Sequence, residues 1–249
     1  MSPSSPVRQS RQAILDSVEK SMSDIGCDVI DLLYIHEPER AGQMRWFHDY
    51  NLYDGPVMEA LEEMKQRGWV KWTGVGGTTA HEMAKVIDTG VFDVVQTAFN
   101  YSLLWQEARY EIFPTAKKHD MGIICSAPLQ QGSLAVRRDE LIENGAPWIS
   151  KPRREQFKAL YSFLDEIGMS IVELSLRFVL SNPDIDCVLV GAKNLKEITE
   201  TVAYSEKGPL SEDILKRIEE IYMMVPFRPT LEPILLPWGD TRPDIGWIV

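Results

Sequence analysis

The sequence predicts an α/β fold of the (β/α)8 TIM-barrel type, incomplete, with about five parallel strands. Short runs of Val, Ile and Leu alternate with segments of helical periodicity, which is typical of parallel strands joined by crossover helices. A doubly wound sheet usually carries a G-x-G-x-x-G loop after its first strand, and the sequence contains none. Polar residues and glycines follow the predicted strands, at the end where a barrel carries its chemistry.

The first predicted unit is an amphipathic helix followed by a buried strand. Residues 10–23 place apolar side chains at helical spacing, and the DLLYI run at 31–35 is continuously apolar. After an aromatic loop, residues 57–68 return to helical spacing until Gly68 ends the helix. The next predicted elements are a strand at 69–77, a helix at 80–88, a strand at 92–100, a helix at 106–119 and a strand at 121–129.

The second half is predicted to be richer in helix. After a long connection, helices are expected near 154–167 and 170–181, a last strand at 187–193, and helices near 194–205 and 211–222. The chain is long enough to bury roughly 70 to 75% of the surface that it exposes when unfolded. We expect one domain, 1–249, whose Pro-rich tail at 225–249 covers the mouth or the flank of the barrel.

Composition narrows the classes of partner. A net charge of −11 disfavours nucleic acid, because a nucleic-acid binder concentrates Lys and Arg on one face. No run of 18 apolar residues and no signal-peptide core occurs, so no membrane partner is expected. The three cysteines are odd in number and far apart, which suits reduced thiols and a cytoplasmic protein. The histidines show no metal-ligand spacing with Cys or acidic residues, so no metal site is predicted.

Two features near the first strand suggest a site. His36 stands where the 31–35 strand ends, although a histidine there is more often a satisfied structural group than a catalyst. The loop beyond it carries Trp46, Phe47 and Tyr50, which suit a pocket enclosing an apolar or sugar ring face. A lid packed only for stability explains the same aromatic residues equally well.

The strand ends follow one another in a characteristic order. A strand ending in His-x-Pro precedes G-V-x-x, V-V-Q-x-x-x-N, A-P-L and V-x-x-G-A-K. This succession resembles the aldo-keto reductases over residues 10–224. The resemblance implies a barrel that binds NAD(P)H without a Rossmann fold and acts on a carbonyl or alcohol: an aldehyde, a ketone or a sugar. His36 would then polarise the substrate oxygen while a tyrosine donates the proton.

The resemblance also implies a cofactor site. Gln96 would contact the nicotinamide amide, and Lys193 would meet a phosphate near a helix N-terminus. Ser126 stands where the family has a stacking aromatic ring, and Glu197 where it has the arginine that grips the 2′-phosphate. The resemblance therefore implies weak cofactor binding that slightly favours NADH over NADPH. The implied cofactor contacts are Gly76, Gly77, Gln96, Ser126, Leu129, Gly191, Lys193 and Glu200.

The family's catalytic Asp, Tyr and Lys have no counterpart here. They belong to a segment of three β–α units that would precede residue 10, and no D-x-x-x-x-Y-G occurs in the chain. We therefore expect a truncated barrel that is impaired as an isolated chain. Either the start of the sequence is misplaced, or the gene is split and a second chain supplies the missing strands. Two alternatives remain: a non-catalytic remnant that binds nucleotide or protein through its open edge, and a non-redox lyase or isomerase.

Overall fold

A computed structural model describes residues 10–40, 46–229, 232–233 and 236. The chain divides into two compact units, Met1–Ala98 with Ala108–Ile124, and Phe99–Glu107 with Cys125–Val249. One sheet carries its strands in chain order, and the first three are paired in parallel, so the predicted parallel α/β fold is confirmed. The strands are β1 (Ile30–His36), β2 (Val70–Gly77), β3 (Val94–Ala98), β4 (Gly122–Ser126) and β5 (Cys187–Leu189).

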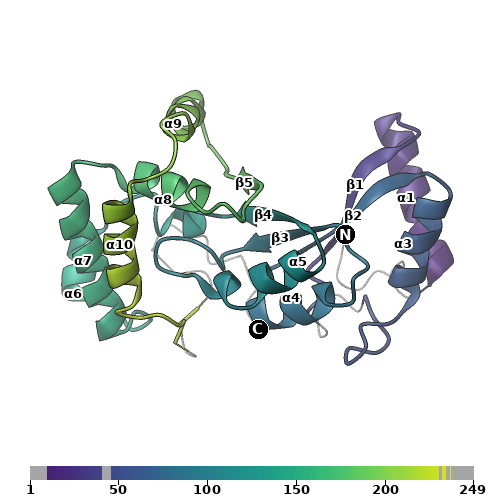
Figure 1. Ribbon diagram of the computed structural model, residues 1–249, viewed down its shortest axis with the longest axis horizontal. Coiled ribbons are helices and arrows are strands. Elements are labelled where there is room, and N and C mark those ends of the chain that lie inside the picture. The colour runs from purple at the N-terminus through teal and green to yellow at the C-terminus, as the bar shows by residue number, and fades with distance from the viewer. Residues whose placement is uncertain (1–9, 41–45, 230–231, 234–235, 237–249) are drawn as a thin grey trace. The chain divides into compact units, whose positions relative to one another are not determined.

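The helices of the first unit cover one side of its strands. Helices α3 and α4 contact β2, α5 contacts β3, and α1 packs on α3 (Figure 1). Ser10 caps α1 because its Oγ accepts a hydrogen bond from the Ala13 N–H at 3.1 Å, and Gly26 ends the helix in the left-handed region. The helices are α1 (Arg11–Ile25), α3 (Pro56–Gln66), α4 (Ala80–Ile87) and α5 (Ile112–Lys118).

The single helix predicted at 106–119 is two elements. A 3₁₀ turn, η2, spans Glu107–Arg109, and α5 begins only at Ile112. Pro114 explains the break, because proline has no N–H and is tolerated only in the first turn of a helix. The prediction of a helix was correct there, and its start was wrong.

The first three strands differ between their two faces. Residues such as Val75 and Val95 are fully buried beneath the helices. The alternate residues face the other way, and there Trp72 is 56% exposed and His36 is also exposed. Parallel sheets are normally buried on both faces, so this second face, which we call the open face, is unusual. It comprises Leu32, Tyr34, His36, Trp72, Gly74, Gly76, Val94, Gln96 and Ala98.

Trp72→Ser is expected to reduce self-association and the binding of an apolar fluorescent dye. The reason is that Trp72 presents its indole on the open face, and exposed apolar patches promote association. Sedimentation and dye titration measure the two effects. Leu52→Ser is the control, because Leu52 is 70% exposed but lies in the loop after β1. An equal effect of both substitutions would contradict the special role of the open face.

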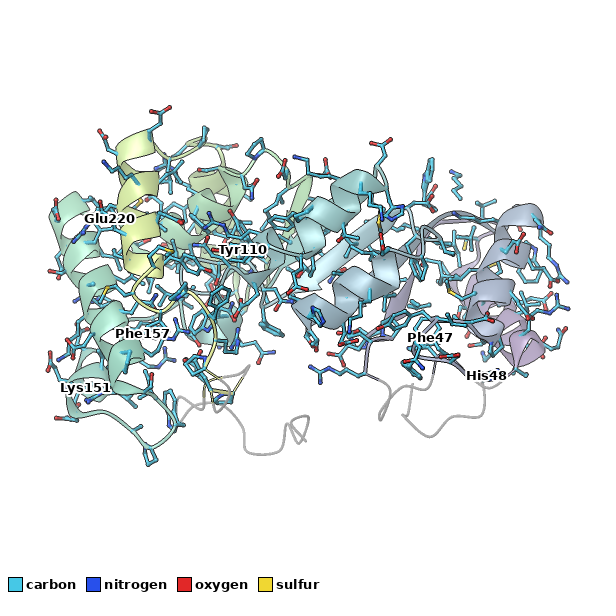
Figure 2. The ribbon with its side chains drawn as sticks, turned by 60° about the horizontal axis from the view of Figure 1, so that its bottom comes forward. Phe47, His48, Tyr110, Lys151, Phe157 and Glu220 are labelled. Atoms are coloured by element: carbon cyan, nitrogen blue, oxygen red, sulfur yellow. The ribbon has the colours of Figure 1, made fainter. Side chains whose placement is uncertain are left out.

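The second unit is mostly helical. Helix α7 lies between α6 and α10 (Figure 1), and Figure 2 shows Lys151 and Phe157 on α7 and Glu220 on α10. Helix α8 packs against α9. The short α6 falls in the connection for which no helix was predicted. The helices are α6 (Asp139–Asn144), α7 (Lys151–Ile167), α8 (Ile171–Leu180), α9 (Leu195–Ser205) and α10 (Glu212–Tyr222), with the 3₁₀ turn η3 (Gln130–Gly132).

The predicted tail at 225–249 is described in part. Residues 237–249, which include Trp238 and Trp247, lie outside the described residues, so the expectation that the tail covers the barrel stays a prediction. Glu232 is described, and its side chain is buried in the second unit. Within the described ranges, no helix is long and apolar enough to cross a membrane.

Candidate functional site

Three predicted site residues form one row across the open face of the first unit. In the strand register His36 pairs with Gly76, and Gly76 pairs with Gln96. Neighbouring strands lie about 4.8 Å apart, so the Cα atoms of His36 and Gln96 are roughly 10 Å from each other. Residues in register point to the same side of a sheet. The imidazole of His36 and the amide of Gln96 therefore flank Gly76 on the same face.

Gly76 leaves the middle of this row open. A Cβ placed on Gly76 would meet no atom closer than 3.9 Å, and the nearest atoms belong to Gln96. A larger side chain would fill this space. The row thus has a donor or acceptor at each end and a floor without a side chain between them, which suits a flat polar group of a ligand.

The backbone after β1 is tied to the neighbouring strand and to the aromatic loop. The Glu37 N–H donates to the Gly76 carbonyl oxygen at 2.6 Å, and the Trp46 indole N–H donates to the His36 carbonyl oxygen at 2.8 Å. These two bonds hold the N–H and the carbonyl oxygen of a single peptide group, the one that joins His36 to Glu37. Trp46 is therefore in direct contact with the residue that we expect to be catalytic.

Phe47 and Tyr50 lie in a small aromatic cluster. Phe47 is only 3% exposed and meets the rings of Tyr50 and Tyr53 edge-on, with centroids 5.5 and 5.4 Å away (Figure 2 labels Phe47 and His48). The Tyr53 hydroxyl donates to Glu82 on α4 at 2.9 Å. Phe47 thus packs as the core of its loop, and the assignment of Phe47 and Tyr50 to a substrate pocket stays a prediction.

Two buried carboxyl groups follow His36, and sequence reasoning missed them. Glu39 Oε1 accepts from the Thr78 N–H at 2.7 Å, and Glu37 Oε1 accepts from the Thr78 hydroxyl at 3.2 Å. Arg40 contacts Glu37 at 3.5 Å. Burial raises the pKa of the Glu39 carboxyl, while the backbone bonds from Thr78 and Thr79 oppose the rise. The His-x-Pro-Glu spacing is the only sequence signal for this arrangement.

Backbone strain collects where strands end. Glu37 follows β1 with φ 47°, Phe99 follows β3 with φ 65°, and Ala127 follows β4 with φ 55°. Each residue has a side chain that disfavours the left-handed region, at a cost of about 1 to 3 kcal/mol. Such strain persists where the surroundings impose it, and it concentrates at functional sites. Each of the three residues lies beside a strand end at which the sequence predicted the chemistry, and Glu37 directly follows His36.

In the second unit, hydrogen bonds hold the turn after β3. The Gln130 side-chain amide donates to the Phe99 carbonyl oxygen at 2.9 Å, and Arg228 donates to the same oxygen at 3.2 Å. Arg153 donates to the Leu104 carbonyl oxygen at 3.1 Å. These contacts account for how the strained Phe99 conformation is maintained.

The second unit also contains a cavity of about 690 Å³, within the range typical of small-ligand sites. Leu129, Gly191, Lys193 and Glu200 were predicted as cofactor contacts, and all four line it. Ser126 is buried at the end of β4 and does not line it. The lining residues are Ala127, Pro128, Leu129, Gln131, Gly132, Ala135, Val136, Val172, Val190, Gly191, Lys193, Glu197, Glu200 and Thr201.

Glu197 already occupies the N-terminus of α9. Its Oε2 accepts from the Lys193 N–H at 2.7 Å, its Oε1 accepts from the Asn194 side-chain amide at 3.0 Å, and the Glu197 N–H donates to Asn194 Oδ1. This is a variant of the capping box, in which the carboxylate accepts from the N–H before the N-cap residue, and the N-x-x-E spacing of 194–197 could have revealed it. An internal carboxylate therefore takes a backbone N–H that a bound anion would otherwise use.

Comparison with known proteins identifies the family. The model of the aldo/keto reductase family matches residues 1–223. The chain belongs to this family. A solved aldo-keto reductase of Bacillus halodurans in its apo form is similar in fold, with a TM-score of 0.69 and 21% identity over 90% of this chain and 72% of that one. Its holo form gives a TM-score of 0.65 at 18% identity.

The curated proteins similar to this chain include sugar dehydrogenases. D-threo-aldose 1-dehydrogenase of a Pseudomonas species is 26% identical over 78% of this chain and 57% of its own length. L-galactose dehydrogenase of Arabidopsis thaliana is 25% identical over 85% of this chain and 65% of its own length. The chain therefore spans somewhat less than two thirds of these relatives.

Proposed function

We propose that the chain forms part of an NAD(H)-dependent oxidoreductase that interconverts a carbonyl and an alcohol on a small polar substrate. The observation that carries this proposal is the row of His36, Gly76 and Gln96 on the open face. Membership of the aldo/keto reductase family supports it, and the two sugar dehydrogenases favour an aldose or a related aldehyde as substrate.

In this proposal each residue of the row has one task. The bound cofactor supplies or accepts hydride. The His36 imidazole holds and polarises the substrate oxygen, and preorganised donors of this kind act on charge that develops during the reaction. The Gln96 amide binds a carboxamide, and Gly76 leaves room for the ring between them.

The catalytic Asp, Tyr and Lys of the family and the elements that cover the open face belong together in this proposal. We assign the proton-donating tyrosine, its lysine and its aspartate to further β–α units, in the same polypeptide or in a second chain. Those units would also bury Trp72 and its neighbours, which is what a parallel sheet requires. Without them, we expect at most a trace of carbonyl reduction.

The cavity of the second unit fits the adenosine diphosphate half of the cofactor. Its volume suffices, no atom lies within 4 Å of a Cβ on Gly191, and the Lys193 ammonium lies at its edge. Glu197 disfavours a 2′-phosphate by charge but can accept a hydrogen bond from a ribose hydroxyl. NADH is therefore the proposed cofactor, and three free cysteines fit a reducing cytoplasm.

Glu197→Arg is expected to shift the ratio of NADPH to NADH affinity by roughly 10- to 100-fold, because a hydrogen bond to a charged group contributes about 1.5 to 3 kcal/mol. Calorimetric titration with each cofactor measures the ratio. Glu206→Arg is the matched control, since it makes the same charge change at the other end of α9. Tight NADPH binding by the unmodified chain, with much weaker NADH binding, would refute the assignment.

The function itself is tested by binding and by turnover. NADH should perturb backbone signals of residues 191–201, and a panel of aldoses and aldehydes should be reduced once the missing β–α units are supplied. A chain that binds neither cofactor, or that reduces no carbonyl when completed, would contradict the proposal. A nucleotide-binding remnant would bind NADH and never turn over.

A further inference from the structure

Glu39 fastens the turn after β1 to the turn after β2. Its Oε1 accepts from two consecutive backbone N–H groups, Thr78 at 2.7 Å and Thr79 at 3.2 Å, directly before α4. The Glu37 N–H bonds the Gly76 carbonyl oxygen in the same region. One backbone bond therefore joins the peptide after His36 to the peptide after Gly76, and one carboxyl group joins the turn after β1 to the Thr78 and Thr79 N–H groups.

The Glu39 carboxyl also fills the space beside Gly77. A Cβ on Gly77 would clash with Met83 Sδ and with both Glu39 carboxyl oxygens, of which Oε2 would lie 2.6 Å away. Gly77 is buried at the end of β2, so the carboxyl could not move aside without leaving its two backbone donors. Glu39 and Met83 thus occupy the space that the side chain of residue 77 would take.

The second carboxyl oxygen has no partner in the described part of the chain. Glu39 is only 7% exposed, and Oε2 is buried without a hydrogen bond. A buried carboxylate oxygen left unpaired is costly, whereas a protonated Oε2 carries no charge. Among the described residues, the charged and titratable groups that act on Glu39 are Glu37 from its own turn and Tyr53 from the aromatic loop. Arg40 pairs with Glu37, and Glu82 of α4 bonds the Tyr53 hydroxyl.

We propose that Glu39 is a positioning residue. Its neutral carboxyl holds the turns after β1 and β2 together and so sets the position of His36 relative to Gly76. Ionisation would leave a charged Oε2 buried without a partner, so the carboxyl moves toward water, leaves Thr78 and Thr79, and both turns loosen. A role of Glu39 in catalysis rests on the proposed function, whereas its link between the two turns rests on the observed hydrogen bonds. Arg40 contacts Glu37, so an ionised Glu39 would add a second buried negative charge with one cation nearby.

The direction of the pH effect follows from the sign of the shift. Burial raises the pKa of Glu39 in the folded protein above its value in the unfolded chain. The folded state then holds the proton more tightly, so the contribution of Glu39 to stability is complete at low pH. It is lost as pH rises from the ordinary glutamate range through the raised pKa.

The test follows the Thr78 and Thr79 amides by NMR across pH, and compares the His36 signals between variants at one fixed pH, in the full chain without cofactor. In the unmodified protein the two amides should show an inflexion that Glu39→Gln abolishes, because glutamine stays neutral and keeps the Oε1 acceptor. Glu39→Ala should show the loosened state at every pH, with amide exchange at Thr78 and Thr79 about tenfold faster. Glu19→Gln, on the exposed side of α1, should change nothing.

Two outcomes would overturn the proposal. One is the same pH dependence in the unmodified protein and in Glu39→Gln. The other is unchanged His36 and Thr78 signals in Glu39→Ala. Because no readout uses cofactor or substrate, these results are independent of whether the chain is a reductase. A merely structural role predicts that Glu39→Gln and Glu39→Ala lose stability without any change in the pH profile.

Discussion

His36→Ala is expected to lower the turnover of carbonyl reduction by about 10²- to 10³-fold in the completed protein, the usual cost of removing one preorganised donor to the reacting oxygen. In the chain alone, the free energy of unfolding should change by less than about 0.5 kcal/mol, because there the side chain is exposed on the open face. The His36 backbone bonds, to Trp46 and in the β1–β2 ladder, do not need the imidazole. Loss of NADH absorbance measures turnover, and chemical denaturation measures stability.

His48→Ala is the matched control for this prediction, since His48 is an exposed histidine of the neighbouring loop. His36→Asn should recover part of the turnover, because its amide can still donate a hydrogen bond. If both histidine-to-alanine variants lose activity equally, the effect is not that of a group acting on the substrate. If His36→Ala unfolds the protein, His36 is a structural group and not a catalytic one.

The places of His36 and Gly76 near strand ends could be predicted from the sequence, because each closes a short apolar run and parallel strands put their C-terminal ends at one edge. Gln96 lies within the predicted strand at 92–100, and only the family resemblance singled it out. The register that aligns them was not readable, because nothing in a single strand states which partner residue it meets. The alignment came from the paired strands in the structure.

The carboxyl groups around this row were not predictable in the same way. Glu39 acts on Thr78 and Thr79, some forty positions along the chain, and only tertiary structure brings them together. Glu197 is different, because its capping partner Asn194 is three residues away and the pattern is local. The sequence thus contained a local signal for the N-terminus of α9, whereas the bonds of Glu39 beside His36 depend on long-range contact.

The largest effect on stability is expected at Arg153, whose side chain is fully buried in the second unit. Its Nε donates to Glu232 Oε2 at 2.8 Å, and its guanidinium lies over the Trp105 ring at 4.8 Å. The Trp105 indole N–H donates to the other Glu232 oxygen at 2.7 Å. This cluster connects α7, the loop after β3 and the tail residue Glu232.

Arg153→Ala is expected to lower the free energy of unfolding by about 3 kcal/mol, because it leaves the buried charge of Glu232 with the more distant Arg228, 3.9 Å away, as its remaining cationic partner among the described residues. Arg154→Ala, at the next position of α7, should cost less than about 0.5 kcal/mol, since Arg154 only bonds a carbonyl oxygen at the surface. Denaturant unfolding measures both. Arg153→Met combined with Glu232→Leu should recover most of the loss, because the double change removes both charges and keeps apolar volume. A cost below about 1 kcal/mol for Arg153→Ala would mean that Glu232 is not held by this ion pair, and that the β3 turn keeps its strained form by the bonds of Gln130 and Arg228 to Phe99 alone.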